Sequence, residues 1–432
     1  MRDRPAIPTL LCRAPVGGAS VCLRWALLLG GLCLPRAAAA QQPVIETPPA
    51  DSAPSAAPSV PQRDVPDVVR ALLGRKPKPP KASTGGRQKL SKGLLPIIGS
   101  NPSYGSYFGA SLVVGGWLGD PATTGLSSAT LGGFYATKGY TSLSFRSNFY
   151  LGNNRMLWKG DWRYFNAGQA TNGLGPATRG LEQFPMNFVL YRFHQTVYRR
   201  TKSASLYVGL GYFFDRWDQI LDVKAEEGVE TPYAVYTLGA SPVRTTSSGL
   251  SFEVLHDSRD NAINATRGVY WNAALRTFTT VLGSDDNWQT LWNDVRLYPR
   301  APVGGGTLAI WSYFWMTFGR APYLDLPASG WDVNGRASRG YLQGRIRGQN
   351  QIYTELEYRL GLTDDGLLGA VGFLNLMATT IPGSGQFGKL DPGYGVGLRL
   401  KFDKRTATNL AVDYARDRFG DGHLFFGMQE VF

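Results

Sequence analysis

Three consecutive residues, His256, Asp257 and Ser258, have the side-chain types of a hydrolytic triad: a base, an acid and a nucleophile. Such a triad works only if the three side chains converge on one point. In a β-strand, neighbouring side chains point to opposite faces, so these three would not meet. The other two histidines, His194 and His423, are distant in the sequence. We therefore expect no catalytic residues.

Side chains that bind metals are also sparse. All three cysteines, Cys12, Cys22 and Cys33, lie within the first 40 residues, and the three histidines are scattered. The acidic pair at 364–365 is followed by Gly366, which is more typical of a turn than of a calcium loop. We expect neither a metal site nor a cofactor.

Residues 1–40 have the composition of a secretory signal peptide. Arginines precede an apolar stretch at 25–34, and a run of alanines follows at 37–40. This order of basic, apolar and small residues predicts cleavage after Ala40. The processed chain would contain no cysteine, so no disulfide could form.

Residues 41–94 are rich in proline, alanine and serine. Closely spaced prolines disfavour helices and central strands, so we predict a disordered periplasmic linker. Within it, residues 65–73 could form two helical turns, which would be marginal in isolation.

The net charge gives no sign of a nucleic-acid partner. The chain has a formal net charge of +13, but nine of these charges fall in residues 1–94. The basic excess therefore belongs mostly to the leader and linker, and we expect no nucleic acid to bind.

Residues 95–432 alternate apolar and polar side chains in short segments separated by turn residues. In 352–360, for example, the apolar Leu356 stands between Glu355 and Glu357. Charges along one strand face are costly in a dry core but cheap in a water-filled lumen, while the other face suits lipid. No later segment approaches the roughly eighteen apolar residues of a spanning helix. The sequence predicts an all-β fold, a transmembrane antiparallel β-barrel of about sixteen strands.

Residues 424–432 have the pattern of a closing membrane strand that ends on an aromatic residue. Such a strand indicates an outer membrane. We expect the barrel assembly machinery to recognise Phe426 and, above all, Phe432 as a C-terminal signal. Glu430 stands where an apolar residue is expected, so it should weaken that recognition.

Several motifs occur together in the second half of the chain. Residues 338–345 (SRGYLQGR) precede the strand expected at 352–360, residues 257–261 (DSRDN) precede Gly268, and further strands follow to the C terminus. In order and spacing, these motifs resemble those of the BamA/TamA-type outer-membrane barrel superfamily, also called the bacterial surface antigen family.

The resemblance implies that the loop bearing Arg339, Gly340 and Tyr341 folds back into the barrel, where the guanidinium meets a carboxylate. Glu357 takes the position of that carboxylate, and Asn375 stands where the family usually places a second acid. We call this contact between the loop arginine and the wall the latch, and the replacement of an acid by Asn375 should weaken it. A planar guanidinium suits bidentate pairing, glycine permits close backbone approach, and tyrosine supplies an apolar wedge.

The resemblance also implies a second set of family residues, in lumenal or turn-stabilising positions. These are Asp257, Arg259, Asp260, Gly268 and Asp413.

The family members that insert or export proteins carry POTRA domains before the barrel, and residues 41–94 have the wrong composition for one. The resemblance therefore implies a short member without POTRA domains, acting in outer-membrane biogenesis or in protein or lipid translocation in a Gram-negative bacterium. A passive pore or structural barrel is the alternative, and an outer-membrane lipid hydrolase is the least favoured. The expected partners are outer-membrane lipids, the assembly machinery during insertion, and an unidentified protein or lipid substrate.

Overall fold

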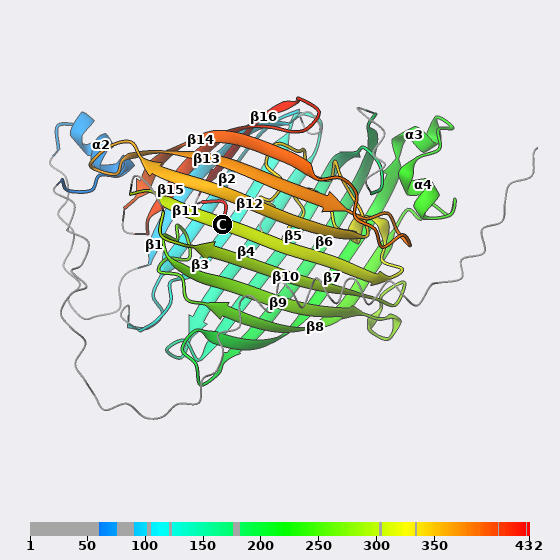
Figure 1. The fold of residues 1–432 in the computed structure, drawn as a ribbon, viewed down its shortest axis with the longest axis horizontal. Coiled ribbons are helices and arrows are strands. Elements are labelled where there is room, and N and C mark those ends of the chain that lie inside the picture. Colours follow the sequence, from blue (N-terminus) through cyan, green and yellow to red (C-terminus); the bar gives the residue numbers. More distant parts are fainter. Residues whose placement is uncertain are drawn as a thin grey trace, which may run out of the picture. The chain divides into compact units, whose positions relative to one another are not determined.

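The computed structural model describes residues 60–75, 90–101, 105–120, 123–175, 182–301, 305–332, 335–404, 406–428 and 430–432. The predicted signal peptide and most of the predicted linker lie outside these ranges. Within them, sixteen strands form one sheet in chain order, with neighbours antiparallel, and Figure 1 shows this sheet wound into a barrel. The predicted fold class and strand number are confirmed. None of the described helices is long and apolar enough to cross a membrane.

The strands are β1 (Ser91–Asn101), β2 (Gly105–Gly116), β3 (Ser127–Ala136), β4 (Thr141–Leu151), β5 (Met156–Thr171), β6 (Phe184–Arg200), β7 (Leu206–Asp222), β8 (Thr245–Asp257), β9 (Gly268–Phe278), β10 (Trp288–Tyr298), β11 (Thr307–Gly319), β12 (Asn350–Gly361), β13 (Leu368–Thr379), β14 (Asp391–Asp403), β15 (Thr408–Arg416) and β16 (Gly422–Met428). The helices are α2 (Val65–Leu72), α3 (Val223–Glu226), α4 (Pro232–Tyr236), η1 (Thr280–Leu282) and η2 (Tyr323–Asp325).

The strands alternate their side chains between an outer and an inner face, as strand geometry requires. On β12, Leu356 is exposed on the outer wall, whereas Glu355 and Glu357 on either side of it are fully buried. The register places Glu355 opposite Asn375 of β13. Polar side chains of adjacent strands therefore collect inside the barrel, and apolar ones outside.

The two ends of the barrel differ in their connections. Turns that follow even-numbered strands are mostly short, such as 152–155 and 201–205, and lie at the end where the chain enters β1. Loops that follow odd-numbered strands include 223–244 and 320–349. We call these the short-turn end and the long-loop end. Figure 1 shows α2 at the first and α3 and α4 at the second.

Two strand boundaries differ from the prediction. The first strand begins at Ser91, within the segment predicted as linker, and the last ends at Met428, although the sequence predicts a strand up to Phe432. The short helix expected within 65–73 is present as α2. It does not stand alone, because it contacts β14 at the short-turn end.

Leu112 and Ser111 on β2 are a matched pair for testing the two faces, since the first is exposed on the outer wall and the second lines an internal cavity. Leu112→Arg should lower the free energy of unfolding in lipid vesicles by about 2 kcal/mol or more, because it places a charge in hydrocarbon. Ser111→Arg should cost much less. Urea titration measures both losses when the folded fraction is taken as the protein whose gel mobility changes on heating. Equal losses would contradict the assigned faces.

Candidate functional site

The loop 320–349, between β11 and β12, folds into the barrel. Its residues Tyr323 and Trp331 join a buried cluster that includes Trp217 of β7. Asp325 accepts a hydrogen bond from the indole of Trp217 at 2.6 Å. The start of the loop is therefore packed against the inner wall.

A buried arginine folds this loop upon itself. Arg347 has no exposed surface, and its Nη1 donates to the carbonyl oxygens of Tyr323, Leu324 and Leu326 at 2.9 to 3.0 Å. One guanidinium thus closes the two ends of the loop against each other. The sequence gives no sign of this role, because the three acceptors are main-chain atoms.

Arg339 lies at the inner tip of the loop and is only 3% exposed. Its Nη2 donates to Glu355 and Glu357 of β12, and its Nη1 donates to Asp413 of β15 at 2.7 Å. Its guanidinium carbon lies 3.5 Å from the centre of the Phe373 ring on β13. One side chain therefore joins the loop to three strands of the wall.

Two arginines of the wall extend this ion-pair network. Arg359 pairs with Glu357 at 2.7 Å, and Arg399 pairs with Asp413 at 2.5 Å and with Glu430 at 2.7 Å. Together with the loop arginine, three guanidinium groups face four carboxylates. Removing one member of such a buried set leaves its partners uncompensated, which is strongly unfavourable.

The residues next to Arg339 fix the backbone of the tip. Gly340 has a φ of +108°, and a Cβ there would lie 2.7 Å from the carbonyl oxygen of Arg416. The Tyr341 hydroxyl donates to a carbonyl oxygen of β14 at 2.7 Å. Asn375 Nδ2 donates to the carbonyl oxygen of Arg339 at 2.9 Å. A carboxylate could not donate this bond, so the asparagine holds the loop in a different way from an acid.

Four of the five residues in the second predicted set lie at the β8–β9 turn, at the short-turn end. Asp257 pairs with Arg259 at 2.7 Å, and Asp260 accepts a hydrogen bond from a backbone amide of the same turn at 2.9 Å. Gly268 has a φ of +102°, a conformation that favours glycine. These residues shape a turn. Asp413 is the member of the set that reaches the loop arginine.

The C-terminal residues turn into the lumen after β16. Phe426 is exposed on the outer wall, but Phe432 is buried against Trp311, with ring centres 5.3 Å apart. Arg359 donates to a backbone oxygen of Phe432 at 2.9 Å. Figure 1 marks the C terminus within the outline of the barrel. The predicted strand up to Phe432 is wrong because Glu430, which would face lipid in such a strand, turns inward to its arginine.

The triad-type residues do not converge. Asp257 lines the internal cavity and is paired with Arg259. His256 has its Nδ1 3.3 Å from the Oγ of Ser205, and Ser258 donates to a carbonyl oxygen across its turn at 3.2 Å. No relay between these three residues follows from this geometry.

One cluster of potential metal ligands was not anticipated from the sequence. The ligand-type atoms of Asp417, Asp421 and His423 lie within 4.8 Å of one another. Arg345 already donates to the two carboxylates, at 2.7 and 2.8 Å. The cluster is therefore an ion pair between the lumenal loop and the β15–β16 loop, with its cation supplied by the chain.

The sequence did not predict how many carboxylates pair with Arg339. It predicts that Glu355 faces the lumen but does not link it to the loop, and it treats Glu430 as a misplaced residue. One signal was available, because Glu430 is the single acidic residue in 422–432. A lone charge on a closing strand needs a polar surrounding, which in a barrel is the lumen.

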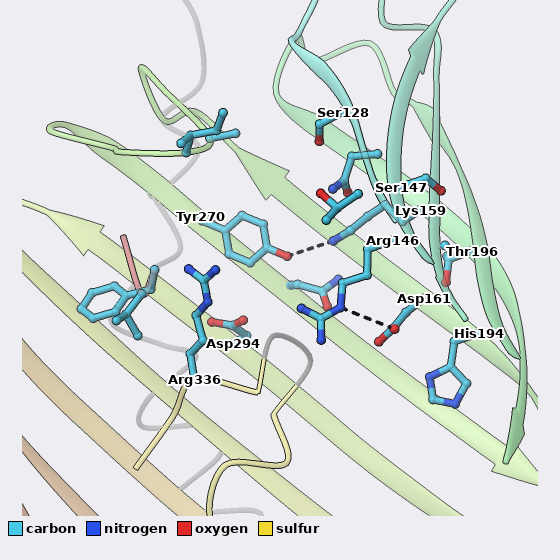
Figure 2. A pocket seen from close by; sticks show the side chains of 18 of the residues that line it. Ser128, Arg146, Ser147, Lys159, Asp161, His194, Thr196, Tyr270, Asp294 and Arg336 are labelled. Atoms are coloured by element: carbon cyan, nitrogen blue, oxygen red, sulfur yellow. Dashed lines mark hydrogen bonds and ion pairs between the residues drawn. The ribbon is translucent and has the colours of Figure 1, made fainter. Parts of the chain in front are cut away.

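A cavity of about 870 Å³ lies inside the barrel. Figure 2 shows charged side chains pointing into it, with Arg146 3.6 Å from Asp161 and the Lys159 amine 3.3 Å from the Tyr270 hydroxyl. The loop does not fill the lumen completely, so there is room for water or a guest beside it.

Replacing Arg339 by alanine should lower the free energy of unfolding in vesicles by about 3–5 kcal/mol, because three buried carboxylates lose a shared cation. Arg339→Lys keeps the charge but not the planar fork, so an intermediate loss is expected. Arg320→Ala, at an exposed arginine of the same loop, is the control and should change stability by less than about 0.5 kcal/mol. Equal effects at positions 339 and 320 would show that the network adds nothing to stability.

No protein-family model and no curated protein matches this chain. Among solved structures, it is similar to BamA from Haemophilus ducreyi lacking POTRA domains 1–3, with 14% identity over 84% of this chain and 76% of that one, and a TM-score of 0.48. It is also similar to CdiB from Acinetobacter baumannii, with 12% identity over 79% of this chain and 60% of that one, and a TM-score of 0.49. A third is Wzi from Escherichia coli, a carbohydrate-binding barrel involved in capsule assembly, with 11% identity over 85% and 92% of the two chains and a TM-score of 0.28.

Proposed function

We propose that this chain is an outer-membrane barrel of the BamA/TamA superfamily that passes a protein or lipid client between its lumen and the bilayer during outer-membrane biogenesis. The observation that carries the proposal is the arginine of the lumenal loop, which is held by Glu355, Glu357 and Asp413. A loop fixed at its tip to several wall strands can transmit a change in those strands to the lumen, and the reverse.

The first and last strands supply a second reason. The strand order begins at β1 and ends at β16, and the internal cavity is lined by Leu94 and Ile97 of β1 and by Phe426 of β16. Leu94 and Phe426 are also exposed on the outer wall. The cavity therefore approaches the lipid-facing surface at the seam between these strands, where a client could leave the lumen sideways.

Vesicles that contain the refolded full chain provide the test. The protein arm measures the folding rate of a small outer-membrane barrel added from urea, and the lipid arm measures the movement of a fluorescent phospholipid between leaflets. We expect the wild-type chain to accelerate one of the two processes over empty vesicles, and Arg339→Ala to lose most of that acceleration because its loop is no longer held.

Arg320→Ala is the matched control and should behave as the wild type does. Rates equal to those of empty vesicles in both arms would overturn the proposal. An acceleration that is the same for the wild type and for Arg339→Ala would leave the loop arginine without a part in the activity and would remove the observation on which the proposal rests.

A passive pore is the second candidate, favoured by the cavity of about 870 Å³ beside the loop. If the loop acts as a plug, the wild type should conduct little in planar bilayers, and Arg339→Ala should raise the conductance or its fluctuations, because the loop loses three carboxylate partners. A large steady conductance that Arg339→Ala leaves unchanged would favour the pore and contradict the latch.

A further inference from the structure

Helix α2 precedes the barrel in the chain and is bound to its short-turn end by two turns. The Lys404 amine pairs with Asp67 at 2.6 Å, and the Lys404 backbone amide donates to Asp64 at 3.2 Å. At the β12–β13 turn, the backbone amide of Arg63 donates to the carbonyl oxygen of Asp365 at 3.0 Å. These contacts hold the helix by its polar side and by the residues that lead into it.

The opposite side of α2 is apolar and exposed. Helical geometry places Val69, Leu72 and the capping residue Leu73 on the side away from Asp67. These three side chains are 48%, 81% and 65% exposed, whereas Asp67 is 3% exposed. Because ion pairs fix the orientation of the helix, it cannot rotate to bury its apolar face against the barrel. We therefore expect another apolar surface to cover this face.

The lipid-facing wall of the barrel adjoins the turns that hold the helix. Leu362 and Leu368 flank the turn that binds Arg63, and both are exposed on the outer side. Arg70 and Arg75 add positive charge at the end of the helix. Aliphatic residues beside arginines, at the level where the hydrocarbon ends, are typical of helices that lie in a membrane interface.

We propose that α2 is a membrane-surface anchor. Its face of Val69, Leu72 and Leu73 inserts into the leaflet at the short-turn end, and Arg70 and Arg75 bind the phosphates of anionic lipids. A lipid surface is the favoured occupant because the turn that holds the helix is flanked by exposed leucines of the outer wall, Leu362 and Leu368. This inference is independent of the client that the barrel handles.

A fluorescent label on the helix tests the anchor. In the full chain with Cys12, Cys22 and Cys33 replaced by serine, Leu72→Cys carries an environment-sensitive nitrobenzoxadiazole dye. Neutral pH keeps the helix docked: burial opposes ionisation of Asp67, but the hydrogen bond and charge of Lys404, together with the interactions of Asp64, outweigh burial and hold the pKa of Asp67 below its usual value. In phosphatidylcholine vesicles, the dye should emit at shorter wavelength and be quenched by spin-labelled lipid, more so when phosphatidylglycerol is added.

The matched control is the same dye at Gln62→Cys, an exposed position on the segment before the helix, which should show neither effect. Arg70→Gln with Arg75→Gln should abolish the response to phosphatidylglycerol while the blue shift remains. A dye at position 72 that behaves like the one at 62 in both lipids would overturn the anchor. The anchor would also be overturned if the dye at position 72 shows no blue shift in vesicles and shifts only when periplasmic extract is added. That result would assign the apolar face to a protein partner.

Discussion

The structure depends on one constraint: a charge taken out of water must be matched by opposite charge or by hydrogen bonds. The inner faces of β12 and β15 bring Glu355, Glu357 and Asp413 close together. Without a cation between them, these carboxylates would repel one another. Arg359 and Arg399 of the wall balance part of this charge, and Arg339 of the loop supplies the cation that all three carboxylates share, so entry of the loop stabilises the wall. The polar interior and the inward path of 320–349 therefore both follow from the need to balance buried charge.

The same network reaches the end of the chain. Asp413 is shared between Arg339 and Arg399, and Arg399 also holds Glu430. Arg359 holds both Glu357 and the backbone of Phe432. The lumenal loop and the C-terminal residues thus touch a common set of charges although they come from different parts of the sequence. A disturbance of either one changes the surroundings of the other, which is the physical basis of the coupling that we propose between the lumen and the seam beside β16.

The period of two along the strands predicted most of the fold. It placed Leu356 outside and Glu355 and Glu357 inside, and segment lengths gave the number of strands. The motif resemblance predicted that Arg339 pairs with Glu357, and the structure places the two side chains in contact. The other partners depend on which strands lie side by side and on their register, and neither is encoded in a local pattern. The end of β16 was missed for a related reason: residues 424–432 fit a strand pattern except at Glu430, and the three-dimensional position of Arg399 shows which partner draws Glu430 into the lumen.

The position of Phe432 has a practical consequence. Its ring lies against Trp311 inside the barrel, and its backbone is held by Arg359. An epitope tag or a fluorescent fusion appended to the last residue would have to lie inside the barrel, in or beside the cavity that Phe432 lines, or would pull the tail out of it. Surface labelling and affinity capture are better built on exposed connections of the long-loop end, for instance near Leu238.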